Sequence, residues 1–389
     1  MDLYDEFKKH LCEKLIPFWK SLKDEENGGF YGYMDSALLI DRMAEKGCIL
    51  NSRILWLFSN AYMVLQDESL KEYADHAYAF LKNCCIDKIN GGVFWSLNYK
   101  GEPMDTTKHT YNQAFAIYAL SSYYDAFKNP EALKLASDLF RLVEIKCKDE
   151  VGYKEAQSSE FFAVENDKLS ENGVMADRTM NTLLHVFEAY TEFYRVSRRN
   201  EVAERLKWIM DMIGLKIFNP AKRRQEVFFN NDMESLIDLH SYGHDIETAW
   251  LVDRGTEVLG DEHYKKLMTP ITNTLEAEIL DVAYYNHSLA NECENGVVNE
   301  WRIWWVQAEA VLGFYNAWQK HPEETRYKEA ALDIWGFIKT KLTDGREGGE
   351  WFWRTDKDGN PDLEKPIVEP WKCPYHNGRL CIEMMKRTR

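Results

Sequence analysis

The chain has no apolar run long enough to cross a bilayer, which takes about 20 consecutive residues. Its first ten residues, MDLYDEFKKH, lack the basic segment followed by an apolar core that marks a signal peptide. The formal net charge is −16, and no basic stripe is visible along the sequence. We therefore expect a cytoplasmic protein with no membrane partner and no nucleic-acid partner.

The eight cysteines show none of the paired spacings of a zinc site, and the adjacent Cys84 and Cys85 are poorly placed for a fold-stabilising disulfide. We expect reduced, mostly buried thiols. The GxSxG nucleophile elbow, the glycine-rich phosphate loop and the HExxH motif are missing as well. These absences leave acid/base chemistry on a neutral substrate as the leading class.

Aromatic residues, in contrast, are abundant, with 13 Trp and 21 Tyr in 389 residues. Flat apolar rings with a polar edge fit the CH-rich faces of sugars, so a small-molecule sugar is a candidate substrate. For any single ring, the alternative is a place in the hydrophobic core.

Glycine next to aromatic residues recurs about every 60 to 70 residues and divides the chain into six units. The clearest copies are ENGGFYGY at 26–33, INGGVFW at 89–95, DEVGYKEA at 149–156 and GREGGEWFW at 345–353, and the weaker ones are RRQEVFF at 223–229 and DVAYYN at 281–286. A fixed period of this length is the signature of a repeat architecture.

Two helical patterns lie in each unit. One has a charged face opposite an apolar stripe, as in an outer helix, and the other is apolar around its circumference, as in a buried inner helix. The predicted outer helices are Leu3–Lys20, Ser69–Asn83, Glu131–Cys147, Glu201–Ile213, Glu262–Leu280 and Glu324–Leu342. The predicted inner helices are Asn51–Leu65, Thr110–Phe127, Arg178–Val196, His244–Leu259, Trp304–Trp318 and Asn377–Met385.

Six outer and six inner helices joined by short β-hairpin loops close most simply into an all-α (α/α)6 barrel. No Pro/Ser linker and no abrupt change of composition divides the sequence. Residues 1–389 are therefore predicted to form a single (α/α)6-barrel catalytic domain.

The inner helices carry polar residues in their first turns or just before them, where parallel helices would bring them to one mouth of the barrel. Helix N-termini favour negative charge, which suits a site where charge develops on oxygen. The residues are Arg53, Tyr111, Asn112, Asn181, His185, His244, Glu247, Trp305, Glu309, His376 and Arg379.

The stretch HSYGHDIETAW at 240–250 is the centre of this pattern. Imidazole can take and give a proton near neutral pH, and a carboxylate such as Glu247 can fix its tautomer. Proton abstraction next to a carbonyl needs a base, a cation or donors for the enediolate oxygen, and an acid that returns the proton. Inversion needs two acid/base groups on opposite faces, which two of the three histidines, His185, His244 and His376, can supply.

Each histidine also has a structural interpretation. His240 and His244, four residues apart, could bind a metal, but no third ligand of matching spacing is evident, and we expect none. His185 could be a hydrogen-bonded core histidine. His376, which follows a Pro-Tyr turn, could lie in a surface loop.

Two charged groups lie in apolar segments, Arg53 in NSRILWLF and Glu309 in WWVQAEAVLGF. A structural salt bridge is the alternative for Arg53, and structural pairing is the alternative for Glu309. A glycoside hydrolase is the rival reaction class, and it would need Glu247 and Glu309 as carboxylates about 6.5 to 9.5 Å apart.

Several strings resemble the N-acylglucosamine 2-epimerase superfamily over nearly the full length: RILWLFSNAY, HTYNQAFAIYALSSYY, LHSYGHDIETAWL, RIWWVQAEAVLGFYNA, GREGGEWFW and WKCPYHNGR. The resemblance is strongest to members that act on β-1,4-linked disaccharides such as cellobiose and lactose. It implies an (α/α)6 barrel and a cofactor-free isomerase that epimerises the reducing-end glucose at C2 through ring opening and a cis-enediolate. Other members act on N-acylglucosamine or interconvert mannose and fructose.

We expect the protein to be a monomer or a weak homo-oligomer. The resemblance also implies roles for individual residues. The implied catalytic residues are His244 and His376 for C2 proton exchange, Glu247 and Glu309 as their supporting carboxylates, Arg53 for the enediolate oxygen, and His185 at the reacting sugar. The implied substrate contacts are Tyr111, Asn181, Trp305 and Trp371.

Overall fold

The protein is represented by a computed structural model that describes residues 2–166, 168 and 173–389. Its residues gather into two compact units. Unit 1 comprises Met1–Arg178, Glu347–Glu350 and Pro366–Arg389, and unit 2 comprises Thr179–Arg346 and Trp351–Lys365. The single catalytic domain over residues 1–389 stays a prediction, and each unit is described by itself.

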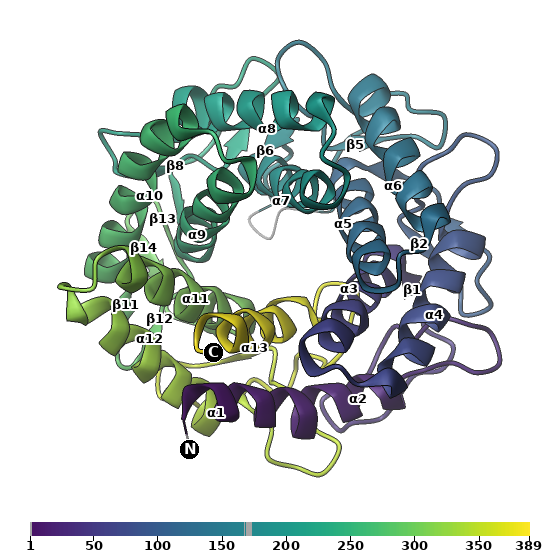
Figure 1. Ribbon diagram of the computed structural model, residues 1–389. Helices are drawn as coiled ribbons and strands as arrows, with labels where there is room; N and C mark the ends of the chain where they lie inside the picture. Colours follow the sequence, from purple (N-terminus) through teal and green to yellow (C-terminus); the bar gives the residue numbers. More distant parts are fainter. Residues whose placement is uncertain (1, 167, 169–172) are drawn as a thin grey trace. The chain divides into compact units, whose positions relative to one another are not determined.

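Unit 1 has two layers of helices (Figure 1). The inner helices are α3 (Cys48–Leu65), α5 (Thr110–Phe127) and α13 (Tyr375–Arg387). The outer helices are α1 (Leu3–His10), η1 (Leu11–Leu15) and α2 (Ile16–Ser21) in one run, then η2 (Glu68–Leu70), α4 (Lys71–Phe80) and η3 (Leu81–Cys85), and then α6 (Pro130–Leu142) and η4 (Val143–Cys147). α3 packs between α5 and α13, while α1, α4 and α6 cover α13, α3 and α5.

Unit 2 repeats this arrangement (Figure 1). Its inner helices are α7 (Met180–Ser197), α9 (Tyr242–Leu259) and α11 (Trp304–Lys320). Its outer helices are α8 (Asn200–Met212) with η5 (Ile213–Ile217), α10 (Glu262–Val282), and α12 (Thr325–Phe337) with η6 (Ile338–Leu342). α9 packs between α7 and α11, and α8, α10 and α12 cover α7, α9 and α11.

The twelve predicted helical segments are all present, which confirms the all-α prediction. The prediction for α5 matches at both ends. Larger differences lie at helix ends: α3 begins three residues earlier than predicted, and α8 continues through η5 to Ile217. η3, η4, η5 and η6 are π-helical turns that extend outer helices, and such end geometry depends on packing more than on periodicity.

The turns from inner to outer helices are built alike. α3, α5, α7 and α9 each end before a residue in the left-handed conformation, whose N–H donates back into the last turn. These residues are Gln66, Lys128, Arg198 and Gly260. These four inner helices are each 18 residues long and end in the same way.

Short strands connect each outer helix to the next inner helix. In unit 1 they are β1 (Lys46–Gly47), β2 (Ser96–Leu97), β3 (Pro103–Asp105), β4 (Lys108–His109) and β5 (Ala156–Gln157), with pairs β1–β2, β2–β3 and β4–β5; β6 (Arg178–Thr179) spans the boundary between the units. In unit 2 they are β7 (Phe218–Asn219), β8 (Arg224–Gln225), β9 (Phe228–Phe229), β10 (Leu239–Ser241), β11 (Tyr284–Tyr285), β12 (Ser288–Leu289), β13 (Glu292–Glu294), β14 (Val297–Asn299), β15 (Arg302–Ile303) and β16 (Arg354–Thr355). Their pairs are β7–β8, β10–β13, β13–β14, β11–β12 and β15–β16, all antiparallel.

The glycine-aromatic motif predicted as a hairpin is clamped to the next inner helix by an amide side chain. In unit 1, the Phe30 N–H donates to Asn51 Oδ1 at 3.0 Å, and the Val93 N–H donates to Gln113 Oε1 at 2.6 Å. Gly29 has a positive φ of 65°, and a Cβ there would lie 2.8 Å from Asn51 Oδ1. The close approach of the hairpin to the helix therefore requires glycine.

Buried ion pairs hold the same hairpins. Lys46 Nζ lies 2.6 Å from Asp24, and Lys108 Nζ lies 2.8 Å from Asp87. Both lysines are buried, and both pair with the aspartate that begins the hairpin. A buried charge needs such a partner, so these cations have a structural role.

By length and composition alone, α3 could cross a membrane, because it is 18 residues long and apolar. However, 83% of that window is buried inside the protein. Burial of this extent is typical of a core helix, and α3 is the central inner helix of unit 1.

Candidate active site

The helical register of the inner helices separates most of the candidate site residues from the structural clamping residues, although His244 is the third residue of α9. Tyr111, Asn181, Trp305 and His376 are the second residues of their helices, and Arg53, His185, Glu247 and Glu309 are the sixth residues of theirs. Positions 2 and 6 lie on one face of a helix. The clamping residues Asn51, Gln113, Asp245 and Gln307 are all fourth residues, about 200° around the helix from position 2.

The clamps recur at that fourth position in unit 2. Gln307 Oε1 accepts from the Leu289 N–H at 2.8 Å, and Asp245 Oδ1 accepts from the Gln225 N–H at 3.3 Å. Asn112 also binds backbone, because its Nδ2 donates to the carbonyl oxygen of Phe94. Of the alternatives Tyr111 and Asn112, this backbone hydrogen bond of Asn112 favours Tyr111 as the residue that faces the site.

Arg53 is the central polar group of unit 1. Its guanidinium is 2% exposed and lies 4.1 Å from the ring centroid of Phe115. Nη2 donates to Tyr111 Oη at 2.8 Å, and Nη1 donates to Cys373 Sγ at 3.4 Å. In the described part of the chain Arg53 forms no ion pair with a carboxylate, so the salt bridge considered for it is not found there.

An aromatic cluster adjoins Arg53 in unit 1. The Trp371 ring lies 5.5 Å from the Trp95 ring and 5.9 Å from the Tyr111 ring. Trp95 and Trp371 are each only partly buried, so ring surface stays accessible for a ligand. Trp95 belongs to the INGGVFW motif but was not singled out from the sequence.

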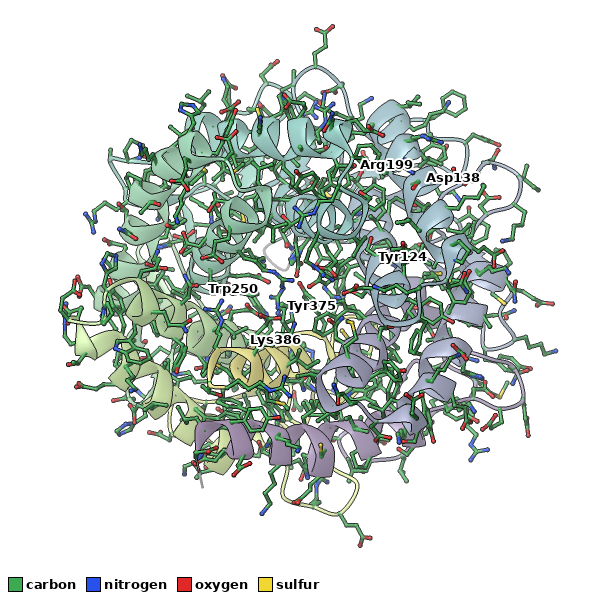
Figure 2. The ribbon with its side chains drawn as sticks, viewed as in Figure 1. Tyr124, Asp138, Arg199, Trp250, Tyr375 and Lys386 are labelled. Carbon is green, nitrogen blue, oxygen red and sulfur yellow. The ribbon has the colours of Figure 1, made fainter. Side chains whose placement is uncertain are left out.

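His376 lies in the first turn of α13 and not in a surface loop. Its ring is 6% exposed and lies 4.5 Å from the ring of Tyr375, which Figure 2 labels at the start of this helix. Arg379, one turn later, donates to Tyr375 Oη and is fully buried, which indicates a structural role.

His244 is the best defined acid/base candidate of unit 2. Its Nδ1 lies 2.7 Å from Ser241 Oγ, and Nε2 forms no hydrogen bond within the described residues. The ring lies 4.7 Å from the Trp305 ring. If Nδ1 donates to Ser241, Nε2 carries the lone pair of a base.

Gly243 allows this contact between α9 and α11. A Cβ at Gly243 would lie 2.6 Å from the Trp305 ring and 2.8 Å from Val306. A larger residue would therefore push the Trp305 ring away from His244.

The environment of His244 favours the neutral ring. Burial and then the proximity of His185 lower the pKa of His244 to about 3, although the Glu309 carboxylate acts in the opposite direction. The His244 side chain is partly exposed to solvent, and hydration of the exposed part opposes the lowering of its pKa by burial. At neutral pH His244 is consequently unprotonated and able to accept a proton.

The other two groups near His244 are held by partners that the sequence did not point to. His185 Nδ1 lies 2.9 Å from Glu188 Oε2, and both side chains are buried. Glu309 is fully buried, and its Oε2 accepts a hydrogen bond of 2.9 Å from Trp250 Nε1. The spacing of Glu188 three residues after His185 is a helical signal that could have identified it.

Asn181 and Glu247 complete the candidate set of unit 2. Asn181 is only partly buried, and its side chain forms no hydrogen bond within the described residues, which leaves it available for a ligand. Glu247 is fully buried on the site face of α9. The hydrogen-bond partner of His244 Nδ1 is Ser241 Oγ, so the support of His244 by Glu247 stays a prediction.

His240 does not share a helix with His244, because it lies in β10 before α9 begins at Tyr242. Its Nε2 lies 2.9 Å from Asp245 Oδ2. Asp245 Oδ1 in turn accepts from Gln225 Nε2 at 2.9 Å. His240 therefore belongs to the hairpin clamp, which indicates a structural role.

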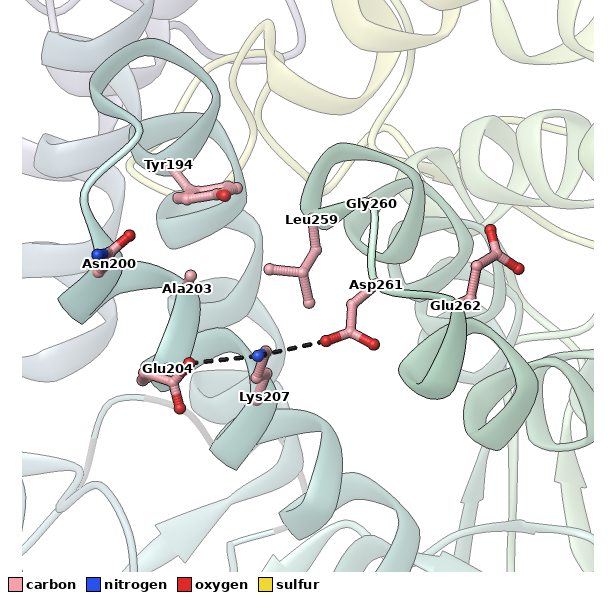
Figure 3. A pocket seen from close by; sticks show the side chains of 9 residues that line it. All are labelled: Tyr194, Asn200, Ala203, Glu204, Lys207, Leu259, Gly260, Asp261 and Glu262. Carbon is pink, nitrogen blue, oxygen red and sulfur yellow. Dashed lines mark ion pairs between the residues drawn. The ribbon is translucent and has the colours of Figure 1, made fainter.

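A surface pocket of about 440 Å³ lies elsewhere in unit 2 (Figure 3). It adjoins the last turns of α7 and α9, where Tyr194 and Leu259 lie, away from the first turns that carry the site residues. Lys207 in this pocket pairs with Glu204 and Asp261, each at 3.2 Å. None of the predicted site residues lines it.

The structure thus brings the candidates together in two sets. Unit 1 holds Arg53, Tyr111, Trp371 and His376, and unit 2 holds Asn181, His185, His244, Glu247, Trp305 and Glu309. The residues that sequence reasoning missed are Cys373, Trp95, Ser241, Glu188 and Trp250. Together the sets offer neutral imidazole, carboxylates, a cation and partly exposed rings.

The family model of N-acylglucosamine 2-epimerase (GlcNAc 2-epimerase) matches residues 28–377 of this chain. The chain belongs to the N-acylglucosamine 2-epimerase family. A curated member of this family from Eubacterium cellulosolvens, named cellobiose 2-epimerase, is 50% identical to the chain over 97% of both sequences. This match confirms the superfamily that the sequence strings resembled.

Solved structures agree over the same length. A sugar epimerase from a ruminal bacterium is 47% identical, covers 100% of both chains and has a TM-score of 0.98. Cellobiose 2-epimerase from Bacillus thermoamylovorans B4167 is 44% identical, covers 99% of both chains and has a TM-score of 0.94. The predicted (α/α)6 fold is consistent with these members of the N-acylglucosamine 2-epimerase family.

Proposed function

We propose that the protein is a cellobiose 2-epimerase. It converts the reducing-end glucose of cellobiose, and of related β-1,4-linked disaccharides such as lactose, into mannose and back. The proposal is supported by relatives of that name at 50% and 48% identity over nearly the whole chain. The reaction makes the protein a carbohydrate isomerase whose substrate is a neutral sugar.

The observation that carries the chemistry is the state of His244. A neutral ring with Nδ1 held by Ser241 and Nε2 left open is what proton abstraction from carbon requires. Burial that keeps the ring neutral also weakens it as a base. The Glu309 carboxylate and the negative charge of the enediolate offset this, because both stabilise the imidazolium that forms.

The proposed reaction begins with ring opening, in which one of the histidines assists proton transfer from the C1 hydroxyl to the ring oxygen. One of His244 and His376 then removes the C2 proton, and the C2–H electron pair moves into the enediolate. Arg53 stabilises the negative charge on the enediolate oxygen. The other histidine delivers a proton to the opposite face of C2, and ring closure gives the epimer.

The remaining candidates bind and orient the sugar. Trp305 and Trp371 are proposed to stack on sugar faces, because their rings are partly accessible. Asn181, His185 and Tyr111 are proposed to bind hydroxyl or carbonyl oxygens. Glu247 and Glu309 are proposed to support the two acid/base histidines.

Incubation of the protein with cellobiose, followed by chromatography of the products, tests this function. We expect glucosyl-mannose as the main product. An aldose–ketose isomerase would move the proton from C2 to C1 and give a ketose instead. Free glucose would contradict the proposal, because it would show cleavage of the glycosidic bond by a hydrolase.

A reducing, cytoplasmic location is also proposed. All eight cysteines are free in the structure, and five of them are buried. Free thiols are stable in a reducing compartment. Fractionation of cells that express the protein, with detection of the enzyme in the soluble cytoplasmic fraction, would support this proposal.

A further inference from the structure

The way Arg53 is held raises a question that its proposed role does not answer. A guanidinium has five N–H donors and keeps its charge at all relevant pH values. Arg53 uses two of its nitrogens on neutral acceptors, Tyr111 Oη and Cys373 Sγ, and its buried Nε has no hydrogen-bond partner in the structure. The side chain is 2% exposed, so the missing partners are not supplied by bulk water.

The choice of neutral acceptors matters for a group that must stabilise an anion. A carboxylate beside Arg53 would fix the guanidinium more strongly, but it would also cancel most of the charge that the enediolate needs. Weak neutral acceptors fix the plane of the guanidinium and leave its charge available. A thiol is such an acceptor, since sulfur accepts hydrogen bonds weakly.

Cys373 is itself held in a fixed place. It is fully buried, and the neighbouring Lys372 forms a buried ion pair with Glu350. On its other side, after Pro374, the ring of Tyr375 lies 4.8 Å from the Arg53 guanidinium carbon. The short segment 371–376 thus carries a candidate stacking ring in Trp371, the sulfur at Arg53, and a candidate acid/base group in His376.

We propose that Cys373 is a positioning residue that orients Arg53 toward the enediolate oxygen without neutralising its charge. The inference rests on the proposed epimerase function. It assigns a role to a thiol that takes no part in proton transfer. Loss of the sulfur should therefore reduce stabilisation of the transition state and leave ground-state binding of the sugar intact.

Steady-state epimerisation of cellobiose by three variants tests the proposal. For Cys373→Ala we expect kcat to fall about tenfold, the size typical of one lost hydrogen bond to a charged group, with KM unchanged. Cys373→Ser keeps an acceptor and should recover most of the lost kcat. The matched control is Cys381→Ala, which changes another fully buried cysteine, located in α13, and should keep the wild-type kcat.

The split between kcat and KM distinguishes positioning from a purely structural role. Thermal unfolding of the three variants shows whether any loss comes from the fold, and Cys373→Ser serves as the test if the alanine variant does not fold. A Cys373→Ala enzyme as active as Cys381→Ala, or a Cys373→Ser enzyme at wild-type stability with kcat lowered tenfold, would overturn the proposal. A wild-type protein that does not epimerise cellobiose would overturn the proposed function, and the role of Cys373 with it.

Discussion

Two buried cations of unit 1 show how the same kind of charge serves different purposes. Lys108 is fully buried and lies 2.8 Å from Asp87, with the ring of Phe94 4.2 Å away. Arg53 is almost as buried, but its hydrogen bonds go to a hydroxyl and a thiol. The paired charge holds a hairpin, whereas the charge without a carboxylate partner is available to an anion formed during the reaction.

The two cations differ in what offsets the free-energy cost of burying their charge. Taking a charge out of water costs several kcal/mol, and only a well-placed opposite charge offsets this cost. Lys108 and Asp87 offset each other in the resting protein. Arg53 remains uncompensated until negative charge develops on a substrate, so the cost contributes to selective stabilisation of the transition state.

The largest expected effect is loss of activity in Arg53→Met. Methionine keeps much of the side-chain volume and removes the charge, so the rate of epimerisation should fall on the order of 10³-fold. The free energy of unfolding should stay level or rise, because an uncompensated buried charge is gone. Product formation from cellobiose and chemical denaturation measure the two quantities, and a clear loss of stability would contradict the comparison.

Replacement of the paired cation Lys108 by methionine should lower the stability of the protein and leave its activity unchanged. Lys108→Met leaves Asp87 buried without its partner, so the free energy of unfolding should fall by about 3 to 5 kcal/mol. Activity at temperatures where the variant stays folded should be unchanged. The double variant Lys108→Met/Asp87→Asn should regain stability by urea denaturation; if it stays as unstable as the single variant, the ion pair is not the cause.

A third cation, Lys320 in unit 2, is only partly buried and is shared by two carboxylates. Its Nζ lies 2.7 Å from Asp253 and 2.8 Å from Glu276, and Thr272 and Asn316 also donate to Asp253. Burial raises the pKa of Glu276 to about 7, since it and repulsion by Asp253 outweigh the attraction of Lys320. This site has excess negative charge, in contrast to Arg53.

The raised pKa predicts a loss of stability with increasing pH. The unfolded chain releases the Glu276 proton near pH 4.3, so the stabilising contribution of the protonated group is complete below that pH and is lost as pH rises through 7. Relative to Glu276→Gln, the wild-type free energy of unfolding should fall between about pH 4.5 and 8 by up to about 3 kcal/mol. If the free energy of unfolding has the same pH dependence in the wild type and in Glu276→Gln, the raised pKa of Glu276 is refuted.

The smallest expected effect is that of Tyr111→Phe. The change removes the other neutral acceptor of Arg53 and keeps the ring, so kcat should fall about tenfold or less. Tyr118→Phe, a buried tyrosine two turns later in α5, is the matched control and should retain the wild-type rate. Equal rates in both variants would show that the Tyr111 hydroxyl does not orient Arg53.

Much of the fold could be predicted from the sequence because the chain repeats. The period of the glycine-aromatic motif and the two helical patterns predicted twelve helical segments, and α5 matches at both ends. The helix ends were harder, since the π-helical turn η5 extends α8 four residues beyond the predicted end. Such turns depend on packing at the helix end, which periodicity does not contain.

The candidate site could be predicted only in part, for a similar reason. First-turn polarity drew attention to Arg53 and Tyr111, but it did not separate them from clamps such as Gln113. The register does separate them once the helix start is known. Cys373 could not be found this way, because its contact joins residues 320 positions apart in the sequence.

The most direct test of this account is epimerisation of cellobiose by the wild-type protein in heavy water. Two acid/base groups on opposite faces of C2 predict that the mannose-containing product carries solvent deuterium at C2, with none at C1, as read by proton NMR. An epimer that keeps its original C2 proton, or a ketose labelled at C1, would contradict the enediolate reaction that Arg53 is proposed to stabilise.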